Sequence, residues 1–402
     1  MKWTMRRGPW HQFGDRSQTF AVDQLHDGIG VGAIISPRDL AFPKAIEYAG
    51  NYRSSDAGVL FDPQFYAPDF NNTKMESYSL AAFRGRTIPQ LQAYIEHHFQ
   101  DFVRALQEIN ASLETDAVIA PAVPYEVGSS DASDLNKWFL DAAREASENL
   151  GIPLYGTVIL GRSTTRSDES MYAALATATS VEADGWYFIN EFESCRVPCD
   201  QDEVYRFCLA GLTLCCMGRP VLHAYAGPMG LLSFAFGAEG VGIGHSQNLW
   251  HFHRSRWTAP ASSRGGNGNA PPRFFSPPLW GTIVDPDESR QLSAGLRNQI
   301  MIDSPYYHSP HYHGSWSANP HLVYAVCSSL MEISRLRTVR RRFSASLDLL
   351  RGACNLHQQI RDEGILLKDD ANAYQEIWLD VLERLLTGQA ADYQYLALVS
   401  RT

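Results

Sequence analysis

Apolar residues gather in short runs along this chain, and segments with an apolar residue every three or four positions separate the runs. Nearly continuous apolar runs of this length are typical of parallel strands that are buried on both faces. The runs predict seven strands and allow an eighth. They are "GVGAIIS" (30–36), "GVLFDPQ" (58–64), "AVIAPAVP" (117–124), "PLYGTVIL" (153–160), "GWYFINEF" (185–192), "PVLHAYAG" (220–227), "GVGIGHS" (240–246) and, as the eighth, "LWGTIVD" (279–285).

The segments between the runs predict amphipathic helices, several of which begin near Ser, Asp or Pro and end on Gly. These helices span 42–52, 88–113, 133–151, 169–183, 201–218 and 227–238. Seven or eight repeats of a strand and then a helix are what a (β/α)8 barrel requires. A doubly wound open sheet is the alternative. We expect the barrel, because no G-x-G-x-x-G motif follows the first predicted strand.

The pattern changes after residue 254. Residues 255–278 are rich in Gly, Pro, Ser and Asn and predict a loop inserted over the barrel mouth. Residues 322–364 and 370–386 predict long amphipathic helices. We therefore expect a barrel over residues 1–290, including the loop at 255–278. A His-rich loop and a C-terminal helical region would occupy residues 291–402.

Composition narrows the class of protein. The chain has 402 residues, of which 45% are hydrophobic, and carries a net charge of -10, so any nucleic-acid binding must be local. Seven cysteines, an odd number in a long chain, indicate reduced thiols. No apolar stretch reaches the roughly 20 residues that a membrane span needs, and the N-terminus lacks a signal-peptide core. We expect a cytoplasmic protein.

In a barrel enzyme the site forms where the strands end and the following loops begin. This rule predicts four catalytic candidates, Asp62, Glu191, His223 and His245. The same rule predicts the substrate-binding candidates Asp39, Gln64, Tyr125, Arg162, Asn190, Tyr225 and Gln247.

Asp62 interrupts an apolar run just before Pro63, where a buried carboxylate is costly unless it is hydrogen bonded or used. Its alternative role is to cap the turn that Pro63 begins. Strand alternation puts Asn190 on one face of its strand and Glu191 on the other, and only one face lines the barrel. His223 and His245 could act with the acids in proton transfer, or be core residues.

A histidine-rich stretch raises the question of zinc. His308, His311, His313 and Cys327 lie within 20 residues of one another, and imidazole and thiolate are ligands that zinc accepts. The alternative is a histidine- and tyrosine-rich surface loop.

Arginines cluster at the start of the C-terminal helices. Arg337, Arg340 and Arg341 could share a helix face and contact phosphates of a nucleic acid. A solvated helix face is the alternative. The loop segments "RSRW" and "SSRGGNGN" could add a flexible basic arm.

The order of segments between 117 and 245 resembles the tRNA-guanine transglycosylase superfamily. The similar stretches are "DAVIAPAVPY", "SDLNKWFLDAAREASENLGIPLYGTVILG", "ADGWYFINEF" and "RPVLHAYAGPMGLLSFAFGAEGVGIGHS", and "GACNLHQQIRDEG" is similar to the helix that supplies the family's last zinc ligand. The resemblance implies a TIM barrel that exchanges a nucleobase. The chain departs from the family at its nucleophilic aspartate, where "GIGHSQN" has His245 and no acid. It also lacks the glutamine that ends the family's fourth strand and the cysteine triplet C-x-C-x-x-C.

Three functions follow as hypotheses. The first is a glycosyltransferase or glycosidase acting on the N-glycosidic bond of a nucleobase in a nucleic acid or nucleoside. The second is a barrel hydrolase of a small molecule or glycan, with Asp62 and Glu191 as its paired carboxylates. The third is a non-catalytic scaffold whose C-terminal helices, "DANAYQEIWLDVLERLL" above all, hold a partner protein or a second copy of the chain.

Overall fold

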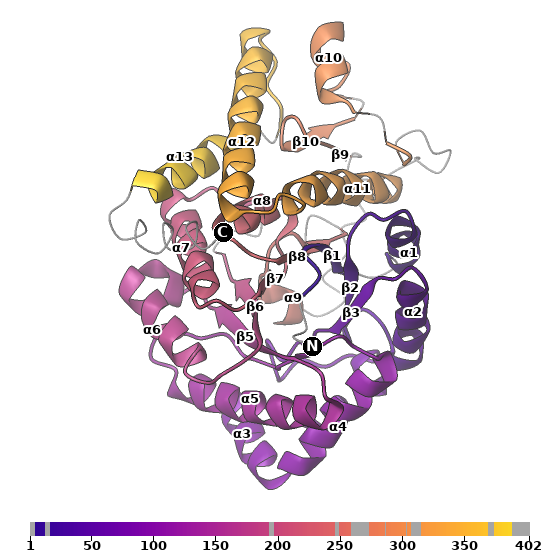
Figure 1. The fold of residues 1–402 in the computed structure, drawn as a ribbon, viewed down its shortest axis with the longest axis vertical. Helices are drawn as coiled ribbons and strands as arrows, with labels where there is room; N and C mark the ends of the chain where they lie inside the picture. The colour runs from indigo at the N-terminus through magenta and orange to yellow at the C-terminus, as the bar shows by residue number, and fades with distance from the viewer. Residues whose placement is uncertain are drawn as a thin grey trace.

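The computed structural model describes residues 5–12, 17–192, 197–245, 249–258, 273–285, 287–302, 304–306, 315–368 and 374–387, with backbone alone at 258 and 315–319. Eight parallel strands close into a barrel in chain order, with β1 hydrogen bonded to β8 (Figure 1). They are β1 (Gly8–Gln12), β2 (Gly32–Ile35), β3 (Gly58–Phe61), β4 (Val118–Ile119), β5 (Leu154–Leu160), β6 (Gly185–Asn190), β7 (Val221–His223) and β8 (Gly240–Gly244). The chain is a (β/α)8 barrel, as the sequence predicts.

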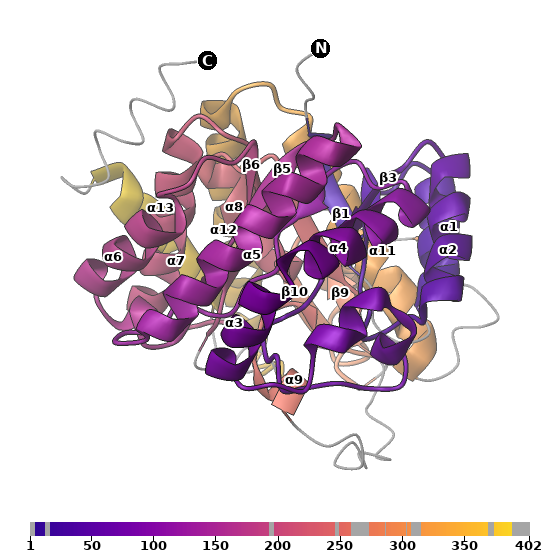
Figure 2. The ribbon, with the colours of Figure 1, turned by 90° about the horizontal axis from the view of Figure 1, so that it is seen from below.

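Helices alternate with the strands and cover the outside of the barrel. Those of the barrel are α1 (Gln18–His26), α2 (Phe42–Ser54), α3 (Ile88–His97), α4 (Phe99–Leu113), α5 (Ser130–Leu150), α6 (Asp168–Ala178), α7 (Gln201–Cys216) and α8 (Gly230–Phe236). Helices α1 and α2 lie side by side on one flank, and α4 and α5 on another (Figures 1 and 2). The predicted helix at 88–113 is two helices, because the chain breaks at His98.

The barrel strands differ from the predicted strands in two places. The first barrel strand is β1, in a segment "GPWHQ" that the sequence pattern did not single out. The eighth predicted strand, 279–285, contains β10 (Gly281–Val284), which pairs antiparallel with β9 (Arg273–Ser276) outside the barrel. Its apolar side chains pack into a small separate core with α10 (Ala294–Ile300) and the end of α12 (Val339–Asp362).

Side chains alternate between the barrel interior and the helices. Trp10, Tyr155, Tyr187, Ile189 and Leu222 share the interior cluster. The residues beside them, such as Phe188 and Val241, belong to the cluster between strands and helices. The alternation settles the orientation of β6, since Glu191 follows Tyr187 and Ile189 toward the interior while Asn190 follows Phe188 outward.

The C-terminal helices pack on the barrel. Helix α12 lies against α8, α13 (Tyr374–Thr387) lies against α7, and α11 (Ser315–Ser334) lies against β1 (Figure 1). Trp378 of α13 is fully buried and donates from Nε1 to the carbonyl of Pro198 at 3.0 Å. The apolar face of α13, which suggested a partner interface, is therefore used within the chain. Among the described helices, none has the length and apolar content that crossing a bilayer would take.

Candidate active site

Asp62 lies at the centre of the barrel mouth, just past the end of β3, and is almost completely buried. Its Oδ2 accepts hydrogen bonds from three tyrosine hydroxyls, those of Tyr66 at 2.6 Å, Tyr187 at 3.0 Å and Tyr225 at 3.3 Å. Its Oδ1 accepts the backbone N–H of Gln64 at 3.1 Å, as the turn-capping alternative predicts. The carboxyl is thus both a turn cap and the focus of a tyrosine cluster.

Burial outweighs these hydrogen bonds in setting the protonation of Asp62. Loss of water disfavours the charged form and raises the pKa of Asp62 to about 6, although the tyrosine hydroxyls and the Gln64 N–H favour the carboxylate. The guanidinium of Arg84 donates to the carbonyl of Gln64 at 3.0 Å. Its positive charge also interacts electrostatically with the Asp62 carboxylate. A carboxyl that titrates close to neutral pH is suited to acid–base chemistry.

A second layer of hydrogen bonds holds the tyrosines. Gln64 donates to the Tyr225 hydroxyl at 2.9 Å and accepts from Ser36 at 2.7 Å. Gln12 of β1 accepts the Tyr225 backbone N–H at 2.7 Å and donates to the Tyr187 hydroxyl at 3.3 Å. Gln64 and Tyr225 both have left-handed backbones, with φ of 54° and 55°. Non-glycine residues held this way store roughly 1 kcal/mol or more each, and such strain concentrates at functional sites.

Glu191 lies at the same mouth, where β6 ends. It is almost completely buried and accepts from Arg254, with its Oε2 2.7 Å from the Nε, while Arg162 lies 3.6 Å away. Arg254 also reaches the carboxylate of Glu126, which follows β4. Burial raises the pKa of Glu191, and the two guanidinium groups oppose that rise. Glu191 therefore faces the barrel interior and is paired with arginine.

A cover segment, residues 249–257, closes the mouth over Asp62. Its Phe252 and Trp257 rings lie 4.9 and 5.0 Å from the ring of Tyr66, and all three side chains are buried. The segment includes part of the short helix α9 (Ser255–Thr258), which lies at the lower edge of the barrel in Figure 2. The loop predicted over the mouth begins here. Residues 259–272 of that loop lie outside the described residues. Its end was predicted wrongly, because residues 273–276 form strand β9.

Charged groups attach the cover segment to three strand ends. Arg254 holds Glu191 and Glu126, and Arg256 donates to Asp39 after β2 at 3.1 Å. Arg38 in turn donates to the carbonyl of Arg256 at 2.9 Å. Asp39, which the sequence predicts as a substrate-binding residue, therefore contacts the cover segment.

His223 is not at the mouth. Its register partner is Phe188, so it points outward under α8, where its Nδ1 lies 2.7 Å from the Ser233 hydroxyl. Burial lowers its pKa to about 3. His223 is therefore a neutral residue of the core. It is the last residue of β7, and its side chain is on the outward face of that strand.

His245 also points outward, away from Asp62. Its Nε2 lies 3.3 Å from Nδ1 of His11, and the ring of Phe20 from α1 stacks on it at 4.6 Å. Burial lowers the pKa of His11 to about 4 and that of His245 well below its ordinary value. The two histidines form a buried neutral pair between the barrel and α1.

The remaining candidates divide between the mouth and its surroundings. Gln64, Tyr225 and Arg162 lie at the mouth, as predicted. Asn190 is buried on the outward face, and its side-chain amide has no hydrogen-bond partner within the described part of the chain. Tyr125 lines a cavity outside the barrel, and Gln247 lies outside the described residues.

The zinc prediction stays untested at three of its four ligands, since His308, His311 and His313 lie outside the described residues. Cys327 is fully buried in α11, and burial raises the pKa of its thiol, which disfavours the thiolate that binds metal. Within the residues that the structure describes, no three His, Cys, Asp or Glu side chains converge as a metal site would require.

The predicted phosphate-binding arginines lie at the opposite end of the barrel. All three are exposed, with Arg337 in the turn between α11 and α12 and Arg340 and Arg341 in the first turn of α12. The neighbouring Arg342 is buried and donates to the carbonyl of Phe234 at the end of α8. It also interacts electrostatically with Glu239 and Arg7, which precede β8 and β1. The structure thus does not bring these arginines together with Asp62.

A scan against protein-family models and a search among curated proteins both found no match. The resemblance to transglycosylases stays a prediction, and the site's own geometry is what bears on function.

Proposed function

We propose that this protein is a barrel enzyme acting on the N-glycosidic bond of a nucleobase, in a nucleic acid or a nucleoside. The observation that carries the proposal is the Asp62 carboxyl within a box of aromatic rings, those of Tyr66, Tyr187, Tyr225, Phe252 and Trp257. Cleavage of a glycosidic bond passes through a cationic, oxocarbenium-like sugar. A carboxylate and aromatic faces both stabilise such a cation, and aromatic faces also stack on bases.

The mouth supplies the two roles that the reaction needs. Above its pKa of about 6, Asp62 is ionised and can stabilise the positive sugar carbon as the bond to the base breaks. The bonding electrons leave with the base, which then needs a proton. Glu191 can donate it once Arg254 moves away with the cover segment, because its burial favours the protonated acid. Water, or an incoming base, then forms a bond to the cationic sugar carbon and loses its proton to Glu191, which is a carboxylate after the first step.

The paired carboxylates also suit hydrolysis of a glycan, since Asp62 and Glu191 face the same mouth. Product analysis separates the two functions. The purified protein is incubated with nucleosides, with DNA and RNA oligonucleotides, and with aryl glycosides, and released base or phenol is measured. Release of base that is lost in Asp62→Asn and kept in Asp69→Asn, an exposed acid seven residues on, supports the proposal. Release from aryl glycosides alone identifies a glycan hydrolase. No turnover of any substrate would favour the scaffold hypothesis.

A further inference from the structure

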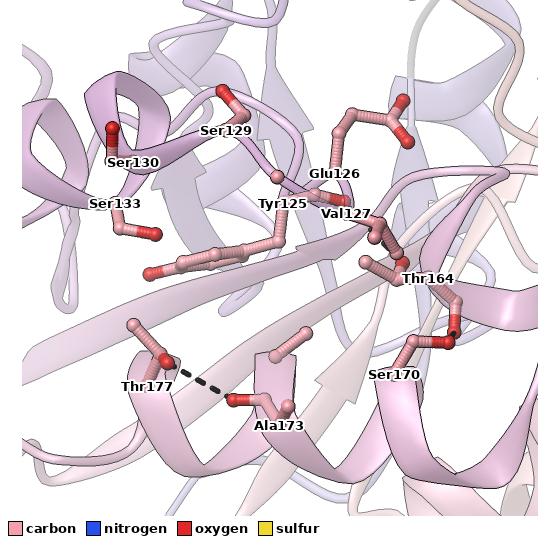
Figure 3. A pocket seen from close by; sticks show the side chains of 12 residues that line it. Tyr125, Glu126, Val127, Ser129, Ser130, Ser133, Thr164, Ser170, Ala173 and Thr177 are labelled. Atoms are coloured by element: carbon pink, nitrogen blue, oxygen red, sulfur yellow. Dashed lines mark hydrogen bonds between the residues drawn. The ribbon is translucent and has the colours of Figure 1, made fainter.

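A cavity of about 390 Å³ lies outside the barrel, between the first turns of α5 and the facing side of α6. Figure 3 shows the ring of Tyr125 extending between the two helices, with Ser129, Ser130 and Ser133 on one side and Ala173 and Thr177 on the other. This volume falls within the range of small-molecule sites, roughly 300 to 1,000 Å³. We propose that this cavity binds a neutral saccharide.

The charge of the cavity lining disfavours anions and cations as ligands. No Lys, Arg or His is among the described residues that line the cavity, so no cationic side chain there would pair with an anion. Among the described lining residues the one acid is Glu126, and its carboxylate turns away from Tyr125 (Figure 3). That carboxylate accepts from the Ser163 backbone N–H at 3.1 Å and from Arg254, so it is already neutralised. A cation is therefore not favoured either.

The hydroxyls of the lining select a ligand that donates hydrogen bonds. Thr164, Ser170 and Thr177 donate to the backbone carbonyls of Gly161, Thr164 and Ala173, at 2.6, 3.1 and 3.0 Å. Because their protons are used, their lone pairs are what they can offer a ligand. A ligand rich in O–H groups matches this pattern.

Two further hydroxyls can bond in either direction. The side chains of Ser129 and Ser133 make no hydrogen bond to any residue within the described ranges. A hydroxyl that can both donate and accept suits the O–H groups of a sugar, which do the same.

The apolar part of the lining suits a sugar ring. Tyr125, Val127, Ala173 and Ala174 present an aromatic ring and small aliphatic groups between the hydroxyls. A pyranose or furanose has apolar C–H faces and hydroxyls around its edge, so it can satisfy both kinds of surface at once. A flat apolar ligand without hydroxyls would leave the Ser129 and Ser133 hydroxyls without partners, which costs binding free energy.

Two alanines of α6 give a matched test. Ala173 lines the cavity, whereas Ala176 does not, and both are exposed on the same helix, so leucine at either position should leave the fold intact. Binding of D-glucose, D-ribose and N-acetyl-D-glucosamine, each alone at millimolar concentration, is measured by saturation-transfer NMR. Inorganic phosphate is the anionic comparison. We expect at least one sugar to bind, Ala173→Leu to weaken it by about tenfold or more, and Ala176→Leu to leave it unchanged.

A second variant, Ser133→Ala, removes a hydroxyl without filling space and should weaken binding by a smaller factor. Absence of sugar binding by the unchanged protein would overturn the proposal. Binding that survives Ala173→Leu, or a preference for phosphate, would do the same. Base release at Asp62 is measured separately, so either proposal can fail while the other stands.

Discussion

The protonation of Asp62 is the most consequential single-residue property of the site. In the folded chain its pKa is about 6, above the ordinary 3.8, so the folded state holds this proton more tightly than the unfolded state. The sign follows from linkage, and this group's contribution to stability falls as pH rises from about 3.8 through 6. The difference between the two pKa values corresponds to about 3 kcal/mol.

We therefore expect the change in the free energy of unfolding caused by Asp62→Asn to be more stabilising near pH 7 than near pH 4. Asparagine cannot ionise, so it removes the cost that the buried carboxylate adds at higher pH. Urea unfolding at several pH values measures the difference, and Asp69→Asn, at an exposed position, is the control. Parallel pH profiles for the unchanged protein and Asp62→Asn would show that the carboxyl titrates normally.

Sequence found some of these residues and missed others for a physical reason. Asp62 and Glu191 could be predicted because an acid at the end of an apolar strand has few structural explanations. His223 could not be assigned to a face, since the end of β7 and its register with Phe188 decide which way it points. Tyr66 and Tyr187 could not be predicted as site residues, because only the folded structure brings their hydroxyls to the same oxygen atom of Asp62.

The cover segment packs on the aromatic rings that surround Asp62. Its arginines hold acids on three strand ends, and Trp257 seals the aromatic box. Because Arg254 is about one-third exposed, each of its ion pairs contributes modestly, on the order of 1 kcal/mol. Together the contacts can still hold the segment closed.

Replacing Arg254 and Arg256 together by alanine should open the cover segment more often. We expect hydrogen exchange of amides in 249–257 to quicken by roughly tenfold, and Trp257 fluorescence to become more accessible to a quencher. Arg104→Ala, which breaks an exposed ion pair with Asp101, is the control. If exchange in the segment does not change, the aromatic contacts alone hold it.

The other end of the barrel is filled by Trp10, and its packing gives a second prediction at this scale. A Cβ added at Gly32 would lie 2.4 Å from the Trp10 ring and 2.6 Å from the carbonyl oxygen of Gly58, so Gly32→Ala should destabilise the fold by about 1–3 kcal/mol. Gly50→Ala, in helix α2 with open space around it, should instead stabilise by about 0.5–1 kcal/mol. Thermal unfolding of both variants checks the pair, and equal effects would contradict the packing argument.

The same scale shows where pattern-based prediction of elements fails. Seven strands could be predicted because their apolar runs are buried on both faces. Strand β1 was missed because its interior positions hold Trp10 and Gln12, with His11 outward, so no apolar run marks it. Residues 279–285 do form a strand, but a short apolar run does not reveal whether its partner is parallel in a barrel or antiparallel in a hairpin.

At the scale of the whole molecule, two charged regions lie at opposite ends of the barrel. The mouth holds arginines that are paired with acids. At the far end, Arg335, Arg337, Arg340 and Arg341 are exposed and pair with no acid among the residues the structure describes. Positive charge at the start of a helix such as α12 opposes the helix dipole and costs stability. We therefore expect this cluster to attract an anionic partner, although the whole chain has a net charge of -10.

The separation of the two regions makes their roles separable by experiment. The triple variant Arg337→Ser, Arg340→Ser and Arg341→Ser should weaken binding of long oligonucleotides and lower the slope of log affinity against log salt by about two to three. Turnover of a single nucleoside should not change, because a nucleoside at Asp62 cannot reach the far end. The control variant replaces Arg351, Arg361 and Arg384, which are paired with acids on the C-terminal helices or the barrel, and it makes the same change in net charge. An equal loss of binding in both variants would mean that net charge, rather than this cluster, attracts the nucleic acid.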